Sequence, residues 1–231
     1  PMPDTTEQRF AAAATLHYLA LADEFALGLR TAWRHLDPDP RNVQETWLVP
    51  AELDPDYYAL ERDLALSAVL GWRHYFAAEW LWDSSIGYLA RLPAAQELFW
   101  NGFHHATDSY ILGERDLDNE RSLNLDLAVV GRHGPWRTRL EGYFYRFFRY
   151  IYQAPRVTET GEALPDPFHG SPVWALTSVA ARVYGLALAQ DYRHRLGAGE
   201  WHAGIKLEAL RGVADGGENL PRMMPYTAGA H

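Results

Sequence analysis

The sequence contains no cysteine among its 231 residues. This absence excludes disulfide bonds, thiolate nucleophiles, zinc–thiolate centres and thiolate-ligated heme. Any heme iron or other metal would therefore need histidine or another non-thiolate ligand.

Positive charge and long apolar runs are also scarce. Lys and Arg total 21 against 30 Asp and Glu, which gives a net charge of −9. Proteins that bind nucleic acid carry a basic surface that neutralises phosphates, so we expect no nucleic-acid partner. No run of about 18 apolar residues occurs, and no charged segment followed by an apolar stretch opens the chain. The sequence therefore predicts a soluble, cytoplasmic protein that does not contact a membrane.

Apolar residues make up 48% of the chain and aromatic residues 13%, which suits a single folded domain over residues 1–231. In most of the chain the apolar side chains recur at helical spacing. This spacing predicts an all-α fold, a single-domain helical bundle. The ranges expected to be helical are Thr6–His35, Asp56–Leu92, Pro93–Glu114, Trp136–Gln153 and Val173–Arg195.

Three stretches depart from helical spacing. Asn42–Pro55 is expected to be a connection. Leu123, Leu125, Leu127 and Val129 alternate with polar residues, as in a short strand or an extended loop. Ala154–Pro172 is rich in proline and glycine, which predicts a surface loop or a lid over a site.

The segment that begins at His202 is the strongest candidate for metal chemistry. Apolar residues follow it at helical spacing up to Gly212, and a tight turn containing Gly216 and Gly217 comes next. A neutral imidazole at the head of such a helix can bind a metal or a heme iron. His194, eight residues earlier, is the alternative ligand, and either histidine can equally be an ordinary surface residue.

The order of a histidine, a helix end and Gly-Gly resembles the proximal-histidine segment of the tryptophan 2,3-dioxygenase and indoleamine dioxygenase superfamily. Three earlier stretches resemble that family in the same order: Thr15–Leu21, His74–Trp80 and Tyr145–Arg149. The resemblance implies a buried cavity that holds heme b, whose iron is bound by His202. It also implies that His74 is the distal, catalytic histidine.

The resemblance further implies a pocket for an aromatic amino acid. Arg149 would bind the substrate carboxylate, and Tyr145 and Phe148 would flank the aromatic ring. The residues implied for the substrate ammonium are Asp215, Gly216 and Gly217.

Two departures from the family pattern bear on the reaction. The threonine expected before Gly-Gly is Asp215, and the family's segment after the substrate-binding arginine is missing after Arg149. These departures favour the bacterial hydroxylase branch, so we expect a monooxygenase that hydroxylates L-tyrosine or L-tryptophan with oxygen or hydrogen peroxide. Cleavage of the indole ring is the alternative within the family. The family usually forms dimers or tetramers, which implies a homo-oligomer.

Two hypotheses come from other classes. A helical non-heme diiron oxygenase would take ligands from several helices, although no Glu-x-x-His pair occurs and His105–Asp108 has the nearest spacing. A helical binding protein without a cofactor would leave all the histidines structural. The candidate diiron ligands are Asp23, Glu24, His74, Glu79, His104, His105, Asp108, Asp191 and His194.

Overall fold

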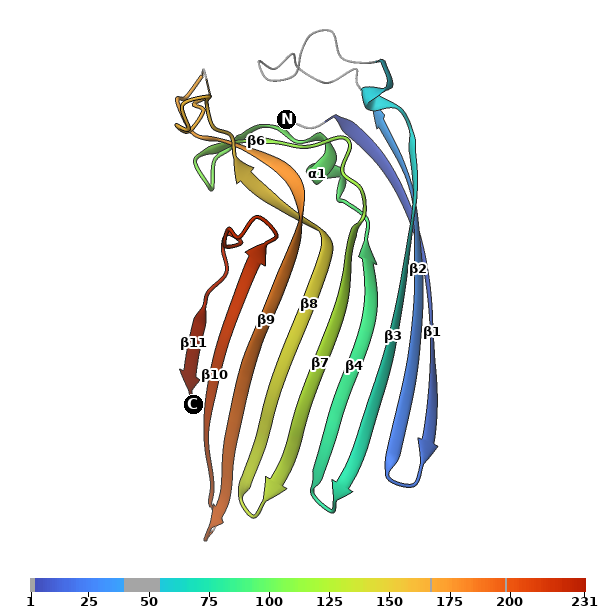
Figure 1. The fold of residues 1–231 in the computed structure, drawn as a ribbon, viewed down its shortest axis with the longest axis vertical. Helices are drawn as coiled ribbons and strands as arrows, with labels where there is room; N and C mark the ends of the chain where they lie inside the picture. Colours follow the sequence, from blue (N-terminus) through green and yellow to red (C-terminus); the bar gives the residue numbers. More distant parts are fainter. Residues whose placement is uncertain (1–2, 40–54, 167, 198) are drawn as a thin grey trace.

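A computed structural model describes residues 3–39, 55–166, 168–197 and 199–231. These residues form one large, mainly antiparallel sheet whose long strands follow each other up and down in chain order (Figure 1). The order across the sheet is β1-β2-β3-β4-β7-β8-β9-β10-β11. The strand bounds are Asp4–Ala20 (β1), Asp23–Asp39 (β2), Glu61–Ala77 (β3), Trp80–Arg91 (β4), Glu120–His133 (β7), Trp136–Pro155 (β8), Val173–Leu196 (β9), Gly199–Ala214 (β10) and Tyr226–Ala230 (β11).

Four short elements accompany the long strands within the described residues. They are the 3-10 helix η2 (Pro55–Tyr58), the α-helix α1 (Ala95–Phe99) and the strands β5 (Asn101–His104) and β6 (Ser109–Leu112). No helix within the described ranges has the length and apolar character needed to cross a membrane.

The predicted all-α bundle is therefore wrong. The range Thr6–His35, expected as one helix, lies in the hairpin β1–β2, and Asp56–Leu92 contains the hairpin β3–β4. The cause is visible at Ala13 and Ala14, which point to opposite faces of the sheet. Because small apolar residues occupy both faces, the apolar positions fit a helical period as well as the two-residue period of a strand.

The other ranges predicted to be helical also contain strands. The predicted helix Trp136–Gln153 lies in β8, Val173–Arg195 lies in β9, and the expected helix after His202 is part of β10. Pro93–Glu114 contains α1 and then β5 and β6. The alternating leucines after residue 122 do lie in a strand, β7. The connection expected at 42–55 falls, up to residue 54, outside the described residues.

The two ends of the sheet differ in their connections. At one end, which we call the turn end, β1–β2, β3–β4, β7–β8 and β9–β10 are joined by hairpin turns of two residues (Figure 1). Leu21, Gly134 and Gly197 have positive φ in these turns, as tight hairpins require. At the other end, which we call the loop end, the connections are much longer.

The connection between β4 and β7 crosses the loop end of the sheet. Its strand β6 pairs in parallel with the start of β9, through Tyr110 and Val173. Its helix α1 packs Leu98 and Phe99 against Leu36 of β2, and all three side chains are buried. The connection is therefore anchored at both β2 and β9.

Candidate membrane-facing surface

Strand register separates the sheet into two chemically different faces, because residues directly paired across antiparallel strands point to the same side. One side, which we call the apolar face, carries mainly apolar residues, many of them large, at alternate positions of the long strands. Members of this face are Phe10, Leu16 and Tyr18 (β1), Phe25, Leu29 and Trp33 (β2), Leu64, Leu70 and Trp72 (β3), Trp82, Ile86 and Tyr88 (β4), Leu123, Leu125 and Leu127 (β7), Leu140 and Phe144 (β8), Tyr184, Leu186 and Leu188 (β9), Ile205, Leu207 and Ala209 (β10), and Tyr226 and Ala228 (β11).

Most of these side chains are open to solvent. Leu16 is 67% exposed, Leu66 56% and Leu186 63%. Water-soluble monomers rarely expose a contiguous apolar patch larger than a few hundred Å², and this one continues across nine strands. Such a surface requires an apolar environment.

Aromatic residues on the apolar face form two rows, near the turn end and near the loop end. Within a strand the two rows are eight residues apart. The pairs are Phe10 and Tyr18 (β1), Phe25 and Trp33 (β2), Trp80 and Tyr88 (β4), Trp136 and Phe144 (β8), and Tyr184 and Tyr192 (β9). Eight strand residues correspond to about 26 Å along the strand, so the rows enclose an apolar band of nearly constant width.

The opposite side, which we call the polar face, is tied together by side-chain hydrogen bonds. Tyr145 donates to Asp126 at 2.7 Å, and Tyr143 donates to Glu208 at 2.9 Å. Ser85 donates to the same Asp126 at 3.3 Å. This face therefore offers carboxylates and phenols on β4, β7, β8 and β10 (Trp80–Arg91, Glu120–His133, Trp136–Pro155 and Gly199–Ala214).

A buried arginine joins the polar face to the loop-end connection. The guanidinium of Arg34 is fully buried and donates to Asp63, with its Nε 3.0 Å from Oδ2, and to the carbonyl of Pro93. Arg115 forms an ion pair with Glu61 and donates to the carbonyl of Tyr57 at 2.7 Å. These contacts fix the start and end of the connection against β2 and β3.

The loop between β8 and β9 is organised by Asp166, which is 1% exposed. Its carboxylate accepts backbone N–H groups of Phe168, His169 and Ser171, each at 3.0 Å. Burial alone would raise the pKa of Asp166, but these donors and the His169 ring together lower it. The segment expected from its sequence to be a surface loop or a lid thus has described residues that gather around one carboxylate.

A second carboxylate neutralises two arginines where β10 ends. Asp215 lies 2.5 and 2.6 Å from the two terminal nitrogens of Arg146 and 3.4 Å from Arg182. The hydrogen bonds from Arg146 lower the pKa of Asp215 to about 2. Asp215 therefore binds two guanidiniums of the protein itself, and its predicted contact with a substrate ammonium stays a prediction.

The histidines predicted to hold and face the heme are far apart in the sheet. His74 of β3 lies on the apolar face, with Nδ1 2.9 Å from Asp23 Oδ1 and its ring stacked on Trp72. His202 of β10 lies on the polar face, half-exposed and 3.5 Å from Glu200. His194 lies on β9, next to that strand's turn.

The predicted substrate-binding residues are not gathered into one pocket. Arg149 forms an ion pair with Asp118 near the loop end, while Tyr145 binds Asp126 on the polar face. Phe148 is 50% exposed. Gly216 and Gly217 lie in the β10–β11 loop, and Gly217 has a φ of +89°.

Among the described residues, no group of three or more His, Cys, Asp or Glu is placed to hold a metal ion. Binding of heme b through the iron by His202 stays a prediction, as does the division into a single domain.

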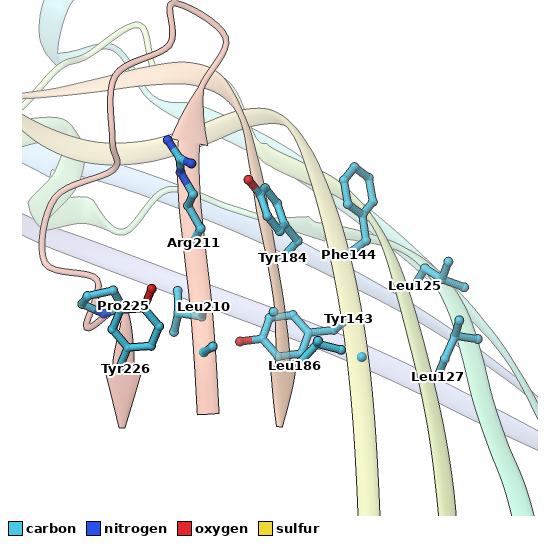
Figure 2. A pocket seen from close by; sticks show the side chains of 13 residues that line it. Leu125, Leu127, Tyr143, Phe144, Tyr184, Leu186, Leu210, Arg211, Pro225 and Tyr226 are labelled. Carbon is cyan, nitrogen blue, oxygen red and sulfur yellow. The ribbon is translucent and has the colours of Figure 1, made fainter. Parts of the chain in front are cut away.

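Two hollows stand out on this molecule. A groove of about 700 Å³ runs over the apolar face from β7 to β11, with Arg211 at its loop end (Figure 2). A cavity of about 660 Å³ lies at the loop end between the β4–β7 connection, the upper part of β8 and the β10–β11 loop, and it is lined by Trp100, Tyr150 and Tyr152 among others.

No family model matches the sequence. Among solved structures, the chain is similar to the copper transporter OprC, with a TM-score of 0.76 and 19% sequence identity over 97% of this chain and 32% of that chain. The FrpB iron transporter from Neisseria meningitidis (F3-3 variant) matches with a TM-score of 0.59 and 12% identity over 93% and 27%. The siderophore receptor PirA from Acinetobacter baumannii matches with a TM-score of 0.57 and 11% identity over 98% and 40%.

The sheet therefore has the fold of part of these transporter and receptor structures. The chain spans about a third of the length of these structures.

This likeness corrects the functional expectations. The predicted membership of the tryptophan 2,3-dioxygenase-like superfamily is wrong, because the similar structures are transporters and receptors. The predicted heme-dependent hydroxylation of an aromatic amino acid with oxygen or peroxide is wrong for the same reason. The three alternatives, an indole-cleaving dioxygenase, a helical diiron oxygenase and a helical binding protein, all assumed a helical fold. They are wrong because the described residues form a sheet. The expected cytoplasmic location without membrane contact is also wrong, since the similar structures are transporters and receptors and the apolar face lies open across the sheet.

Sequence reasoning missed the functional surface altogether. The signal that could have found it is the recurrence of Trp, Tyr and Phe at intervals of eight residues, with alternating leucines between them.

Proposed function

We propose that this chain forms part of the wall of an outer-membrane transporter that carries a metal ion or a metal chelate. The observation that carries the proposal is the apolar face bordered by two aromatic rows. Strands that cross a bilayer need about 9 to 11 tilted residues, with an outward apolar band and aromatic residues at both interfaces. The eight-residue spacing of the rows matches that requirement on five strands.

The connections give the wall an orientation. Outer-membrane proteins have short turns on the periplasmic side and longer loops outside. The turn end is therefore placed toward the periplasm, and the loop end, with the β4–β7 connection and the ordered Asp166 loop, faces outward. The polar face then lines the passage.

The nature of the cargo follows from the similar structures and from the polar face. Their titles name a copper transporter, an iron transporter and a siderophore receptor. Asp126 and Glu208 of the polar face accept hydrogen bonds from hydroxyl groups, which do not neutralise their negative charge, and such carboxylates attract cations.

The edges of the sheet must be paired for this function. Strand β1 is hydrogen-bonded on one side to β2, and β11 on one side to β10. Backbone groups left unpaired in hydrocarbon cost several kcal/mol each, so we propose that further strands pair with these edges and close the wall.

The test is membrane insertion of the protein that carries this sheet together with the strands that pair with its edges. It is refolded into phosphatidylcholine vesicles, and tryptophan fluorescence is recorded with lipids brominated at different depths. Because Trp72, Trp80 and Trp136 lie in the row near the turn end, bromines near the headgroups should quench more strongly than bromines at the bilayer centre. Absence of quenching at every depth would overturn the proposed wall.

The cargo is tested separately on vesicles that contain the inserted chain. Uptake of radiolabelled copper and of a radiolabelled iron(III) chelate is compared with uptake by empty vesicles. Faster uptake of either than by empty vesicles supports the proposed cargo class. If neither is taken up faster than by empty vesicles, the proposed cargo is wrong, while the proposed position of the sheet in the membrane is unaffected.

A further inference from the structure

The groove on the apolar face combines an apolar hollow with a positive charge at one end. Two small residues, Gly142 of β8 and Ala209 of β10, line it. The larger side chains of Phe144, Tyr184 and Tyr226 also line it (Figure 2). The result is a long hollow of about 700 Å³ within an otherwise leucine-rich surface. Its size falls in the range of small-molecule sites.

The loop end of this groove is cationic. Arg211 is exposed on the apolar face, directly paired with Tyr184, and its guanidinium points toward the loop end (Figure 2). Among the described residues, no hydrogen bond or ion pair of the Arg211 side chain is present, in contrast to Arg146 and Arg182.

Two more arginines adjoin it on the same face. Arg182 lies two residues beyond Tyr184 on β9, and Arg146 of β8 pairs directly with Arg182. A single carboxylate, Asp215, binds both. Three guanidiniums on three neighbouring strands are thus matched by one negative charge, and an uncompensated cation remains beside an apolar groove.

We propose that this groove binds a phosphate-bearing lipid, with an acyl chain along the groove and the phosphate on Arg211. A lipid is the class of ligand that joins a long apolar chain to an anionic group, and arginine binds phosphate through paired N–H donors. The inference rests on the proposed position of the apolar face in the bilayer. There, Arg211 lies beside the loop-end aromatic row, at the depth of the headgroups of the outward leaflet.

The test measures retained lipid on the full-length chain by native mass spectrometry. The chain is inserted into phosphatidylcholine nanodiscs that contain equal small amounts of dioleoylphosphatidic acid and dioleoylglycerol, which share acyl chains and differ in the phosphate. Insertion is checked first by bromolipid quenching. We expect retention of phosphatidic acid to exceed that of diacylglycerol by about tenfold, as for hydrogen bonds to a charged group.

Two pairs of variants separate the site from general effects. Arg211→Gln should reduce the preference for phosphatidic acid about fivefold or more, whereas Arg132→Gln, an exposed arginine of β7 near the turn end, should leave it unchanged. Ala209→Trp should fill the groove and lower retention of both lipids, whereas Ala203→Trp, on the same face of β10 but outside the groove, should not.

The outcomes are distinct. An inserted chain that retains both lipids equally, or that loses its preference as much in Arg132→Gln as in Arg211→Gln, overturns the lipid site and leaves the wall intact. A chain that does not insert overturns the proposed function and this site with it.

Discussion

Arg146 of β8 and Arg182 of β9 are directly paired across the sheet, and the carboxylate of Asp215 binds both guanidiniums. Like charges in direct cross-strand positions are destabilising. The β10–β11 loop supplies the anion that removes this repulsion, so the charge of Asp215 links the loop to two strands.

Stability should therefore depend on pH through Asp215. Its pKa is about 2 in the folded chain against 3.8 for the ordinary group, so its contribution is fully present above about pH 4 and is lost as the pH falls through about 2. Urea unfolding in micelles between pH 2 and pH 5 should show this loss in the wild type and a weaker slope in Asp215→Asn. Glu218→Gln, in the same loop, is the control, and a slope unchanged by Asp215→Asn would contradict the prediction.

An introduced positive charge should destabilise the protein far more at Leu188 than at the adjacent Ala187 of β9. Leu188 lies on the apolar face midway between the aromatic rows, and Ala187 lies on the polar face, paired with Glu141 and Glu208. Leu188→Arg should lower the free energy of unfolding from a bilayer by about 2–4 kcal/mol. Ala187→Arg places the new charge beside two carboxylates and should lower the free energy of unfolding much less. Both values are measured by urea titration of vesicle-inserted protein, and equal losses would contradict a lipid-facing apolar face.

The helical interpretation of the sequence failed for a definable reason. Strands of this sheet carry Ala and Gly on the polar face, as at Ala26, Ala32 and Gly71, so polar positions do not stand out between the leucines. The two-residue period is clear around Leu123–Val129, where Asn124 and Asp126 alternate with leucine. Hairpin turns such as Leu21–Ala22 lack a strong turn signal, so one hairpin looks like a single long helix.

The candidate surfaces depend on register, which the sequence does not display. Arg146, Arg182 and Arg211 are distant in the chain and become neighbours only through the pairing of β8, β9 and β10. The loop centred on Asp166 was expected as a loop from its prolines and glycines, but its order comes from three backbone donors that meet one buried carboxylate.

That carboxylate should control the local stability of the β8–β9 loop. Asp166→Asn removes the charge that accepts the N–H groups of Phe168, His169 and Ser171, and hydrogen bonds to charged groups are worth about 1.5–3 kcal/mol each. Limited proteolysis of inserted protein should cut residues 156–172 several-fold faster in this variant, with the strands intact. Glu162→Gln in the same loop should cut at the wild-type rate, and an unchanged rate in Asp166→Asn would refute the role of the carboxylate.

The buried Arg34 should be the costliest single polar residue to remove at the loop end. Arg34→Met leaves Asp63 beside a buried apolar side chain and removes a donor from the Pro93 carbonyl, and breaking a buried ion pair from one side costs about 3–5 kcal/mol. Arg30→Met, an exposed arginine on the same face of the same strand, should cost under about 1 kcal/mol. If the loss of stability comes from the Asp63 carboxylate left without a partner, adding Asp63→Asn to Arg34→Met should restore part of the free energy of unfolding, measured with urea. A double variant less stable than Arg34→Met alone would show instead that the packing of α1 against Leu36, and not the charge of Asp63, sets the cost.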